Sequence, residues 1–244
     1  MPFDRKVRQE RIAGGISVGA ETGSTGTLSG IFYDLDRKSY VMLSNYHVFN
    51  GYLIFQPGKI EKGWKVEDLV GNVDKKVEFN EEKNIFKRFI CYVFGIWCES
   101  EYNYLDAATA RILDRCNRAF SEGVYLDDGR IIKPEGAHDG DGIIGMRAWK
   151  VGRTTGYTEG SVISDCATIR VWYGNRARLF KDVIIVAGKS EPGDSGSPVF
   201  ICDGDDLNKS KFVGILFAGS NDYFVVCKYK YIKDYLRVVW PTSN

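Results

Sequence analysis

Residues 193–199 read Gly193-Asp194-Ser195-Gly196-Ser197-Pro198-Val199. Glycine tolerates positive φ, so a serine between two glycines favours a sharp bend that exposes its hydroxyl beside unpaired backbone N–H groups. A serine nucleophile needs preorganised donors for the oxyanion of its tetrahedral intermediate, and the amides of Gly193 and Ser195 are the candidates. The alternative is an ordinary surface turn, because Gly, Asp, Ser and Pro are the usual turn formers.

A serine hydroxyl also needs a neighbouring base, and the chain has only two histidines. His47 lies at the end of the apolar, strand-like run 40–48, where an imidazole can be held rigidly. His138 lies in the Gly- and Asp-rich stretch 137–142, which is typical of a solvated loop. We therefore predict that His47 is the base. The alternative for His47 is a structural histidine at a strand end.

A third group should orient the imidazole and stabilise it when it is charged. Asp106 precedes the small, apolar run 107–112, where a carboxylate can be buried only with a partner. Asp114 follows the same run and is typical of an exposed turn. We predict Asp106 as the acid, with an ordinary capped or salt-bridged aspartate as the alternative.

The candidate base, acid and nucleophile occur in the order His, Asp, Ser. The α/β-hydrolases place Ser first and subtilisin-like enzymes place Asp first, whereas the order found here is that of chymotrypsin-like enzymes. Three motifs of the sequence resemble those of the trypsin/chymotrypsin-like serine peptidases: Gly193–Pro198 resembles the nucleophile motif, Ser44–Val48 the base motif and Leu105–Ala108 the acid motif.

Further segments direct this resemblance to the bacterial, archaeal and viral branch of the family. The stretch Gly14–Gly19, followed by Gly26–Leu28, resembles the first strands of such peptidases. The stretch Lys150–Val162 resembles the first hairpin of their second barrel. The similarity therefore extends over most of the chain.

The resemblance implies an all-β, chymotrypsin-like double β-barrel with a C-terminal helix, and serine endopeptidase activity through an acyl-enzyme. His47, Asp106 and Ser195 would form the catalytic triad. The backbone near Phe217, Ala218 and Gly219 would bind substrate as an added strand. Phe217 departs from the family pattern, because many relatives carry a small hydroxyl residue at that position.

The resemblance suggests two further roles, one for a run near the N-terminus and one for a lysine near Ser195. The run Arg11-Ile12-Ala13 resembles the activation site of secreted zymogens, in which a freed Ile12 amine would pair with Asp194. Lys189 lies six residues before Ser195 and would favour an acidic residue before the scissile bond if it formed the pocket floor. An exposed lysine is the commoner outcome.

Short apolar runs separated by Gly, Asn and Asp turns predict strands at 31–34, 40–43, 107–112, 168–173, 183–187, 198–202, 211–217 and 223–228. Apolar residues near helical spacing predict a C-terminal helix over 229–239. We expect an N-terminal barrel over 1–120, a connection over 121–142 and a C-terminal barrel over 143–244. Residues 75–100 are expected to be an insertion that forms a flap, a partner-binding face or extra core.

The composition agrees with a globular enzyme, and 33 Lys and Arg against 32 Asp and Glu leave no global field to recruit nucleic acid or an anionic membrane. The six cysteines form no Cys-x-x-Cys pair, so we expect no metal and no cofactor. The first eleven residues lack the apolar segment of a secretory signal, and we expect a cytoplasmic protein. Its expected partner is a protein or peptide substrate, and its oligomeric state stays open.

Two other function classes also stay open. The fold could serve as a regulatory or binding module that is released when an activating protein partner engages residues 75–100. Alternatively, the chain could be an esterase with weak peptidase activity.

Overall fold

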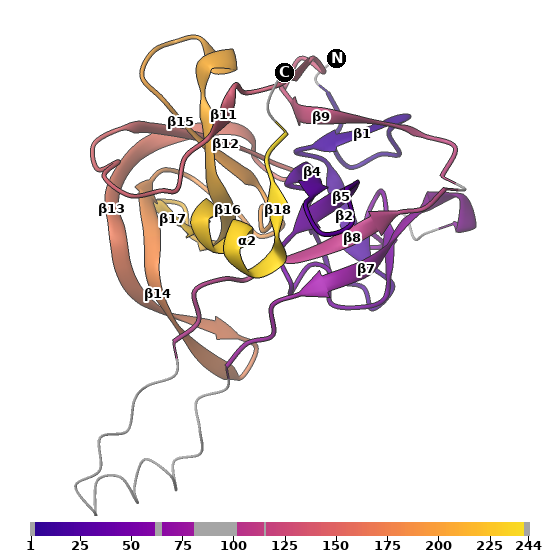
Figure 1. Cartoon of the computed structure of the whole chain (residues 1–244), viewed down its shortest axis with the longest axis horizontal. Coiled ribbons are helices and arrows are strands. Elements are labelled where there is room, and N and C mark those ends of the chain that lie inside the picture. The colour runs from indigo at the N-terminus through magenta and orange to yellow at the C-terminus, as the bar shows by residue number, and fades with distance from the viewer. Residues whose placement is uncertain (1–2, 62–64, 81–101, 115, 242–244) are drawn as a thin grey trace, which may run out of the picture.

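Strands dominate the computed structural model of this protein, which describes residues 3–61, 65–80, 102–114 and 116–241 (Figure 1). The strands are β1 (Arg11–Gly14), β2 (Ser17–Ala20), β3 (Thr25–Thr27), β4 (Gly30–Asp34), β5 (Ser39–Ser44), β6 (Leu53–Phe55), β7 (Leu69–Lys76), β8 (Ala108–Ile112), β9 (Ala119–Tyr125), β10 (Ile131–Ile132), β11 (Gly136–Ala137), β12 (Arg147–Gly152), β13 (Gly156–Tyr173), β14 (Arg176–Ala187), β15 (Pro198–Cys202), β16 (Lys211–Gly219), β17 (Tyr223–Lys228) and β18 (Val238–Val239). The described helices are two short 3₁₀ helices, η1 (Val66–Asp68) and η2 (Leu207–Lys209), and one α-helix, α2 (Tyr229–Leu236).

The strands β2 to β8 and the final strand β18 form one curled sheet in the order β18-β4-β5-β8-β7-β6-β2-β3. Strand β5 is exposed at Ser39 and Tyr40 and buried from Val41 to Ser44, where the β-branched and apolar side chains of Val41, Met42 and Leu43 suit a buried strand. It pairs antiparallel with β8, so Ser44 at its end faces Ala108 at the start of β8. The chain that follows β5 and the chain that precedes β8 therefore lie at the same edge of the sheet.

Six strands of the second half close into a barrel. They follow the order β16-β15-β12-β13-β14-β17, and β17 pairs back onto β16. Strand β15 begins at Pro198, which faces Ile215 of β16. Residues 193–197 therefore enter the barrel beside the last part of β16.

The longest strands, β13 and β14, form a hairpin that curves along one side of the second half (Figure 1). Register shifts between Val162 and Thr168 mark β-bulges, which bend a strand. Strand β14 pairs with β17 only over residues 184–187, so the tip of the hairpin projects beyond the barrel. Tyr173 is the last residue of β13 and faces Arg176 across the turn at the tip.

Buried apolar residues form one cluster within each half and a larger cluster that joins the two halves. The joining cluster contains Phe32 of the first sheet and Phe180 and Phe200 of the barrel. Leu105 and Ala107 belong to the same cluster, and Asp106 between them is fully buried. The candidate acid therefore lies at the junction of the two halves, where water is excluded.

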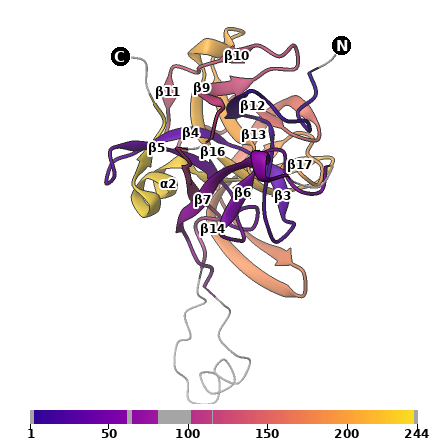
Figure 2. The same ribbon diagram turned by 90° about the vertical axis from the view of Figure 1, so that its right-hand side faces the viewer.

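The C-terminal helix is shorter than the sequence predicts. The apolar spacing predicts a helix to residue 239, whereas α2 ends at Leu236 because Arg237 adopts the left-handed conformation with φ 58°. Residues Val238 and Val239 then form β18 and pair with β4 of the first sheet. The chain end thus returns to the first half, and α2 lies close to this crossing (Figure 2).

Of the two segments that the sequence predicts as an insertion and as a connection, the first lies partly outside the described ranges and the second contains strands. Of the predicted insertion over 75–100, residues 75–80 are described, and residues 81–100 lie outside the described residues. The predicted connection over 121–142 contains most of β9 together with β10 and β11.

Candidate active site

His47 and Asp106 meet at the edge of the first sheet where β5 ends and β8 begins. His47 Nδ1 lies 2.5 Å from Asp106 Oδ2, and the His47 backbone N–H donates to Asp106 Oδ1 at 3.2 Å. The Asp106 side chain is fully buried, whereas the His47 side chain is 28% exposed. A carboxylate on Nδ1 fixes the imidazole tautomer and leaves Nε2 free to accept a proton.

Residues from both halves of the molecule hold Asp106. Asn45 Nδ2 donates to its carbonyl oxygen at 2.7 Å, and the Asp106 N–H donates to Cys227 Sγ of β17 at 3.3 Å. The Tyr173 hydroxyl donates to Asp106 Oδ2 at 2.7 Å. Burial, and then the Asp106 charge, raise the pKa of the Cys227 thiol well above its ordinary value, so it remains a neutral thiol. The sequence prediction included none of these three contacts.

Ser195 lies on a turn that is anchored to β3 of the first sheet. Its carbonyl oxygen accepts a hydrogen bond from the Thr27 N–H at 2.7 Å. A Cβ atom at Gly26 would lie 2.7 Å from that oxygen and 2.5 Å from Val48 Cγ2. Ser195 and the residue that follows His47 therefore pack against the same glycine.

The Ser195 hydroxyl makes no hydrogen bond with His47 or with any other group in the described ranges. Catalytic hydrogen bonds are often long without substrate and shorten when substrate binds. The structure thus joins the candidate acid to the candidate base directly, and it places the candidate nucleophile nearby with a free hydroxyl.

Gly193 requires glycine for two reasons. Its φ of 100° lies in the left-handed region, and a Cβ atom there would lie 2.4 Å from Thr154 Oγ1 and 2.6 Å from Arg153 Nε. The Pro192 carbonyl is turned toward Thr154 Oγ1, which donates to it at 2.9 Å. Within the described part of the chain, the N–H groups of Gly193 and Ser195 have no acceptor.

Three solved protease structures match nearly the whole chain. Thermobifida fusca protease A matches with a TM-score of 0.63 at 14% identity, over 96% of this chain and 100% of that chain. A glutamic-acid-specific serine protease, described as using a histidine triad in substrate binding, matches with a TM-score of 0.64 at 16% identity, over 94% and 100%. Cellulomonas bogoriensis chymotrypsin matches with a TM-score of 0.58 at 13% identity, over 96% and 100%. The chain has the chymotrypsin-like fold.

This result, with the curled sheets and helix α2 described above, confirms the predicted all-β, chymotrypsin-like double β-barrel with a C-terminal helix. No protein-family model matches the chain, and no curated protein matches it. The chymotrypsin-like fold of this chain was therefore recognisable from three short motifs and their order, at a level of identity where whole-sequence similarity is weak.

In this chymotrypsin-like fold, a cation from within the barrel holds Asp194. Lys150 Nζ of β12 lies 3.1 Å from Asp194 Oδ2, and both side chains are fully buried. Thr155 Oγ1 donates to the same oxygen at 2.7 Å. Burial alone would raise the pKa of Asp194, but the Lys150 charge, the Thr155 hydroxyl and nearby backbone amides hold it below its ordinary value. In the intact chain Ile12 is buried within β1, and Lys150 is the cation beside Asp194, so the structure offers no support for the alternative pairing with a freed Ile12 amine.

Lys150→Met is expected to lower the free energy of unfolding by about 3–5 kcal/mol, because it leaves the buried Asp194 carboxylate without its cation. Urea unfolding followed by tryptophan fluorescence measures this change. The matched control is Lys211→Met, which removes an exposed lysine of β16 and should change stability by less than about 0.5 kcal/mol. A loss below about 1 kcal/mol for Lys150→Met would contradict the anchoring role of this pair.

The predicted substrate-binding residues Phe217, Ala218 and Gly219 form the end of β16. Ala218 and Gly219 pair with β17 on one side, whereas the pairing with β15 on the other side ends at Ile215. In the described residues no strand occupies this second side. The Phe217 side chain is only 3% exposed and packs within the core, so the segment presents its backbone and not the Phe217 ring.

Two other candidates from the sequence lie outside this arrangement. Lys189 is 55% exposed and lies 2.6 Å from Glu191 Oε1, so it forms a surface ion pair and not a buried pocket floor. His138 Nδ1 accepts a hydrogen bond from the Gly140 N–H and closes a local turn.

No group of three or more His, Cys, Asp or Glu residues in the described ranges is arranged to hold a metal ion. None of the helices described is both long enough and apolar enough for a membrane span.

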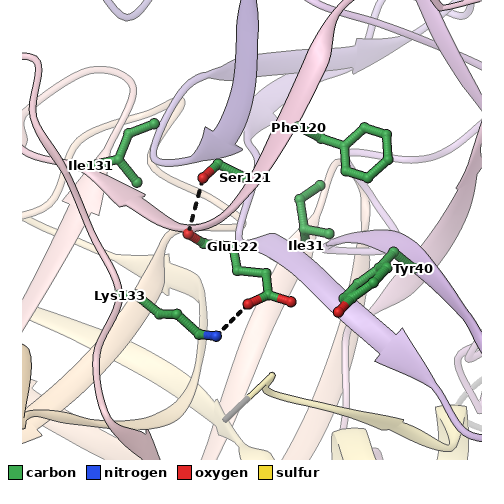
Figure 3. Close-up of a pocket in the computed structure, with 7 residues that line it drawn as sticks. All are labelled: Ile31, Tyr40, Phe120, Ser121, Glu122, Ile131 and Lys133. Atoms are coloured by element: carbon green, nitrogen blue, oxygen red, sulfur yellow. Dashed lines mark hydrogen bonds and ion pairs between the residues drawn. The ribbon is translucent and has the colours of Figure 1, made fainter. Parts of the chain in front are cut away.

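A separate hollow lies on the first half and involves β4, β5, β9 and β10 (Figure 3). Tyr40, Phe120, Glu122 and Lys133 are among its lining residues, and Lys133 forms an ion pair with Glu122. Burial would raise the pKa of Glu122, but Lys133 and Tyr40 hold it below its ordinary value. The acid and the base of this hollow are paired with each other, and none of the three catalytic candidates lines it.

Proposed function

We propose that this chain is a serine endopeptidase that hydrolyses peptide bonds through an acyl-enzyme. The observation that carries this proposal is the 2.5 Å contact between His47 and the buried Asp106, at the edge where the Ser195 turn packs. If Ser195 were an ordinary turn residue, His47 a structural histidine and Asp106 a capped aspartate, these residues would have no reason to lie together, because they come from three distant parts of the sequence. A buried carboxylate, a partly exposed imidazole and a free hydroxyl together suit nucleophilic acyl transfer.

In the proposed mechanism, Ser195 Oγ forms a bond to the substrate carbonyl carbon while its proton passes to His47 Nε2. The tetrahedral intermediate then collapses, the C–N bond breaks, and His47 gives the proton to the leaving amine. Water attacks the acyl-enzyme by the same route, with His47 again as base and then as acid, and releases the new carboxylic acid and Ser195. Asp106 orients the imidazole and stabilises its positive charge in each step.

The negative oxygen of the tetrahedral intermediate would be bound by the backbone amides of Gly193 and Ser195. Both amides lack an acceptor among the described groups of the protein, so they are available to a ligand. Their positions are fixed before substrate arrives, because Thr27 Oγ1 donates to the Gly193 carbonyl at 2.9 Å and Asp194 is anchored by Lys150. Preorganised donors of this kind lower the barrier most where they require no rearrangement.

The substrate backbone would pair with Phe217, Ala218 and Gly219 as an added strand. This segment has one edge that no described strand occupies, and it lies beside the Ser195 turn because the Gly196 N–H donates to the Leu216 carbonyl at 2.8 Å. Backbone pairing accepts peptides of varied sequence. We therefore propose protein or peptide substrates.

The preference of the glutamic-acid-specific neighbour cannot be produced in this chain by the same residues. That protease is described as using a histidine triad in substrate binding. This chain has two histidines in all, of which His47 is already bonded to Asp106. Any preference for acidic residues would need other cations, and Lys189 is paired with Glu191 at the surface.

A fluorophosphonate probe tests the proposed function directly. We expect the purified chain to react with one equivalent of probe, and peptide mapping by mass spectrometry to locate the adduct on Ser195. Heat-denatured protein should not react, because the free serine hydroxyl is a weak nucleophile without its base. A peptide library then gives the cleavage preference. Absence of labelling, or an adduct on another residue, would refute the proposal, and turnover of esters alone would identify an esterase.

A further inference from the structure

We propose that Tyr173 is a positioning residue for the His47–Asp106 pair, and that the β13–β14 hairpin thereby supplies a hydroxyl which β16 lacks. This inference rests on the proposed function, because it concerns how the acid and the base of that function are held. It assigns a role to the tip of the hairpin, which the sequence prediction described only as a strand.

The hydroxyl of Tyr173 and the imidazole of His47 bind the same carboxylate oxygen. Asp106 Oδ2 lies 2.7 Å from the Tyr173 hydroxyl and 2.5 Å from His47 Nδ1, while Oδ1 accepts the His47 N–H. Buried carboxylate oxygens need donors, and this carboxylate is fully buried. Without the Tyr173 hydroxyl, Oδ2 would keep the imidazole as its only side-chain partner in the described residues.

Packing on several sides fixes the ring of Tyr173. Its centroid lies 5.5 Å from that of His47 in an edge-to-face arrangement, 5.0 Å from Phe79 and 6.2 Å from Phe180. The Arg178 guanidinium lies over the Phe79 ring at 4.5 Å. Such aromatic contacts restrict the ring, so the hydroxyl is presented to Asp106 in one position. Tyr173 therefore orients the carboxylate and also forms a wall beside the imidazole.

The hydroxyl that donates to Asp106 comes from the hairpin, and β16 has no side-chain hydroxyl of its own. By its resemblance to the family, position 217 is where many relatives carry a small hydroxyl residue, and this chain has Phe217 there. The Phe217 ring packs on Phe180 with centroids 4.6 Å apart and has no group that can donate. Tyr173, at the end of β13, supplies the side-chain hydroxyl that Phe217 of β16 lacks.

The hairpin is also joined to the segment that carries Asp106. Asn103, three residues before Asp106, donates its N–H to the Leu179 carbonyl at 2.8 Å and accepts the Lys181 N–H at 2.9 Å. These two bonds straddle Phe180 of β14, which faces Asn103 as an isolated bridge. Strand β14 of the hairpin is therefore bonded directly to the segment that leads into Asp106.

The Tyr173 hydroxyl stays protonated and keeps its role as a donor. Burial, and then the Asp106 charge, raise its pKa well above the ordinary value for tyrosine. The direction of the bond is thus settled, with the phenol donating and the carboxylate accepting.

The first test is Tyr173→Phe, which keeps the ring and removes only the hydroxyl. We expect the rate of fluorophosphonate labelling to fall about tenfold or more, the effect of losing a hydrogen bond to a charged group. The matched control is Tyr157→Phe on the same strand, whose hydroxyl also donates to a carboxylate, that of Glu159, at 2.8 Å. This control should label at the wild-type rate.

A proton NMR measurement separates positioning from a merely structural role. The proton between His47 Nδ1 and Asp106 Oδ2 should resonate far downfield, and Tyr173→Phe should move it further downfield, because the carboxylate loses a competing donor. Replacement of Tyr173 by 3-fluorotyrosine preserves the shape but strengthens the donor, and it should move the resonance upfield. The Tyr157→Phe control should leave it in place.

An unchanged labelling rate together with an unmoved resonance would overturn the role of Tyr173. If Tyr173→Phe fails to fold, the 3-fluorotyrosine protein decides the question, and an unmoved resonance there would also overturn it. The resonance does not depend on catalysis. A wild-type protein that shows these shifts but never labels would refute the proposed function and still support the role of Tyr173.

Discussion

Replacing Ser195 with alanine should lower peptide turnover about a million-fold and abolish covalent labelling by a fluorophosphonate. The variant removes the only atom that can form the acyl bond in the proposed mechanism, and it leaves the amides of Gly193 and Ser195 in place. Turnover of a fluorogenic peptide chosen from the library measures the first effect, and gel fluorescence of the labelled protein measures the second. Residual catalysis from the oxyanion donors should persist at a very low level.

The matched control for this experiment is Ser121→Ala. Ser121 lies on β9 beside the hollow of Figure 3, and the one hydrogen bond of its hydroxyl within the described ranges is to the neighbouring Glu122 carbonyl, at 3.5 Å. We expect wild-type turnover and labelling from this variant. If Ser195→Ala labels as fast as the control, Ser195 is not the nucleophile, because a phosphonate adduct forms only on the activated side chain.

The sequence predicted the candidate acid and base because both are tied to strand ends. Strand β5 runs to Ser44 and strand β8 starts at Ala108, and the prediction placed the corresponding apolar runs at 40–43 and 107–112. Antiparallel pairing then brings the residues beyond these ends together, whatever the rest of the sheet does. Short strands bounded by turns are the feature that local pattern reveals best.

Strands β15 and β17 of the second half were also predicted closely, whereas the β13–β14 hairpin was predicted only in part. The runs at 198–202 and 223–228 coincide with β15 and β17, whose residues are buried almost throughout. Strand β13 extends from Gly156 to Tyr173, whereas the apolar pattern predicted a strand only over 168–173 and the resemblance to the family placed a hairpin over Lys150–Val162. Much of this strand is half-exposed, and its glycine, serine and aspartate residues have low β-propensity, so cross-strand pairing and not local preference forms it.

The partners of the catalytic candidates depend on tertiary contacts that leave little trace in the sequence. Lys150 did carry one signal, since a lysine inside the buried run Ala148–Val151 requires a counter-charge. Nothing in the sequence indicated that Asp194 would be that counter-charge. Tyr173 carried no signal, because an aromatic residue at a strand end is usually part of the core.

Replacing His47 with glycine should slow turnover about as much as losing the nucleophile, roughly a million-fold, because Ser195 then has no base. The chain provides its own control in His138, the other of its two histidines. His138 closes a turn through the Gly140 N–H and contacts none of the three catalytic candidates in the described residues. We expect His138→Gln to keep wild-type turnover. Equal losses in the two variants would mean that neither imidazole is specific to the chemistry.

Added imidazole should partly restore the His47→Gly variant, because the His47 side chain is 28% exposed and the vacated space opens to solvent. A free imidazole that enters this space would meet the Asp106 carboxylate and the Tyr173 hydroxyl, which stay in place on the far side. The labelling rate should therefore rise with imidazole concentration and saturate. The same addition should do nothing for Ser195→Ala, and it should restore a His47→Gly/Tyr173→Phe double variant less than the single variant. Equal rescue of the two would show that Tyr173 does not help to position the base, and no rescue of either would show that His47 acts in some way other than by accepting a proton.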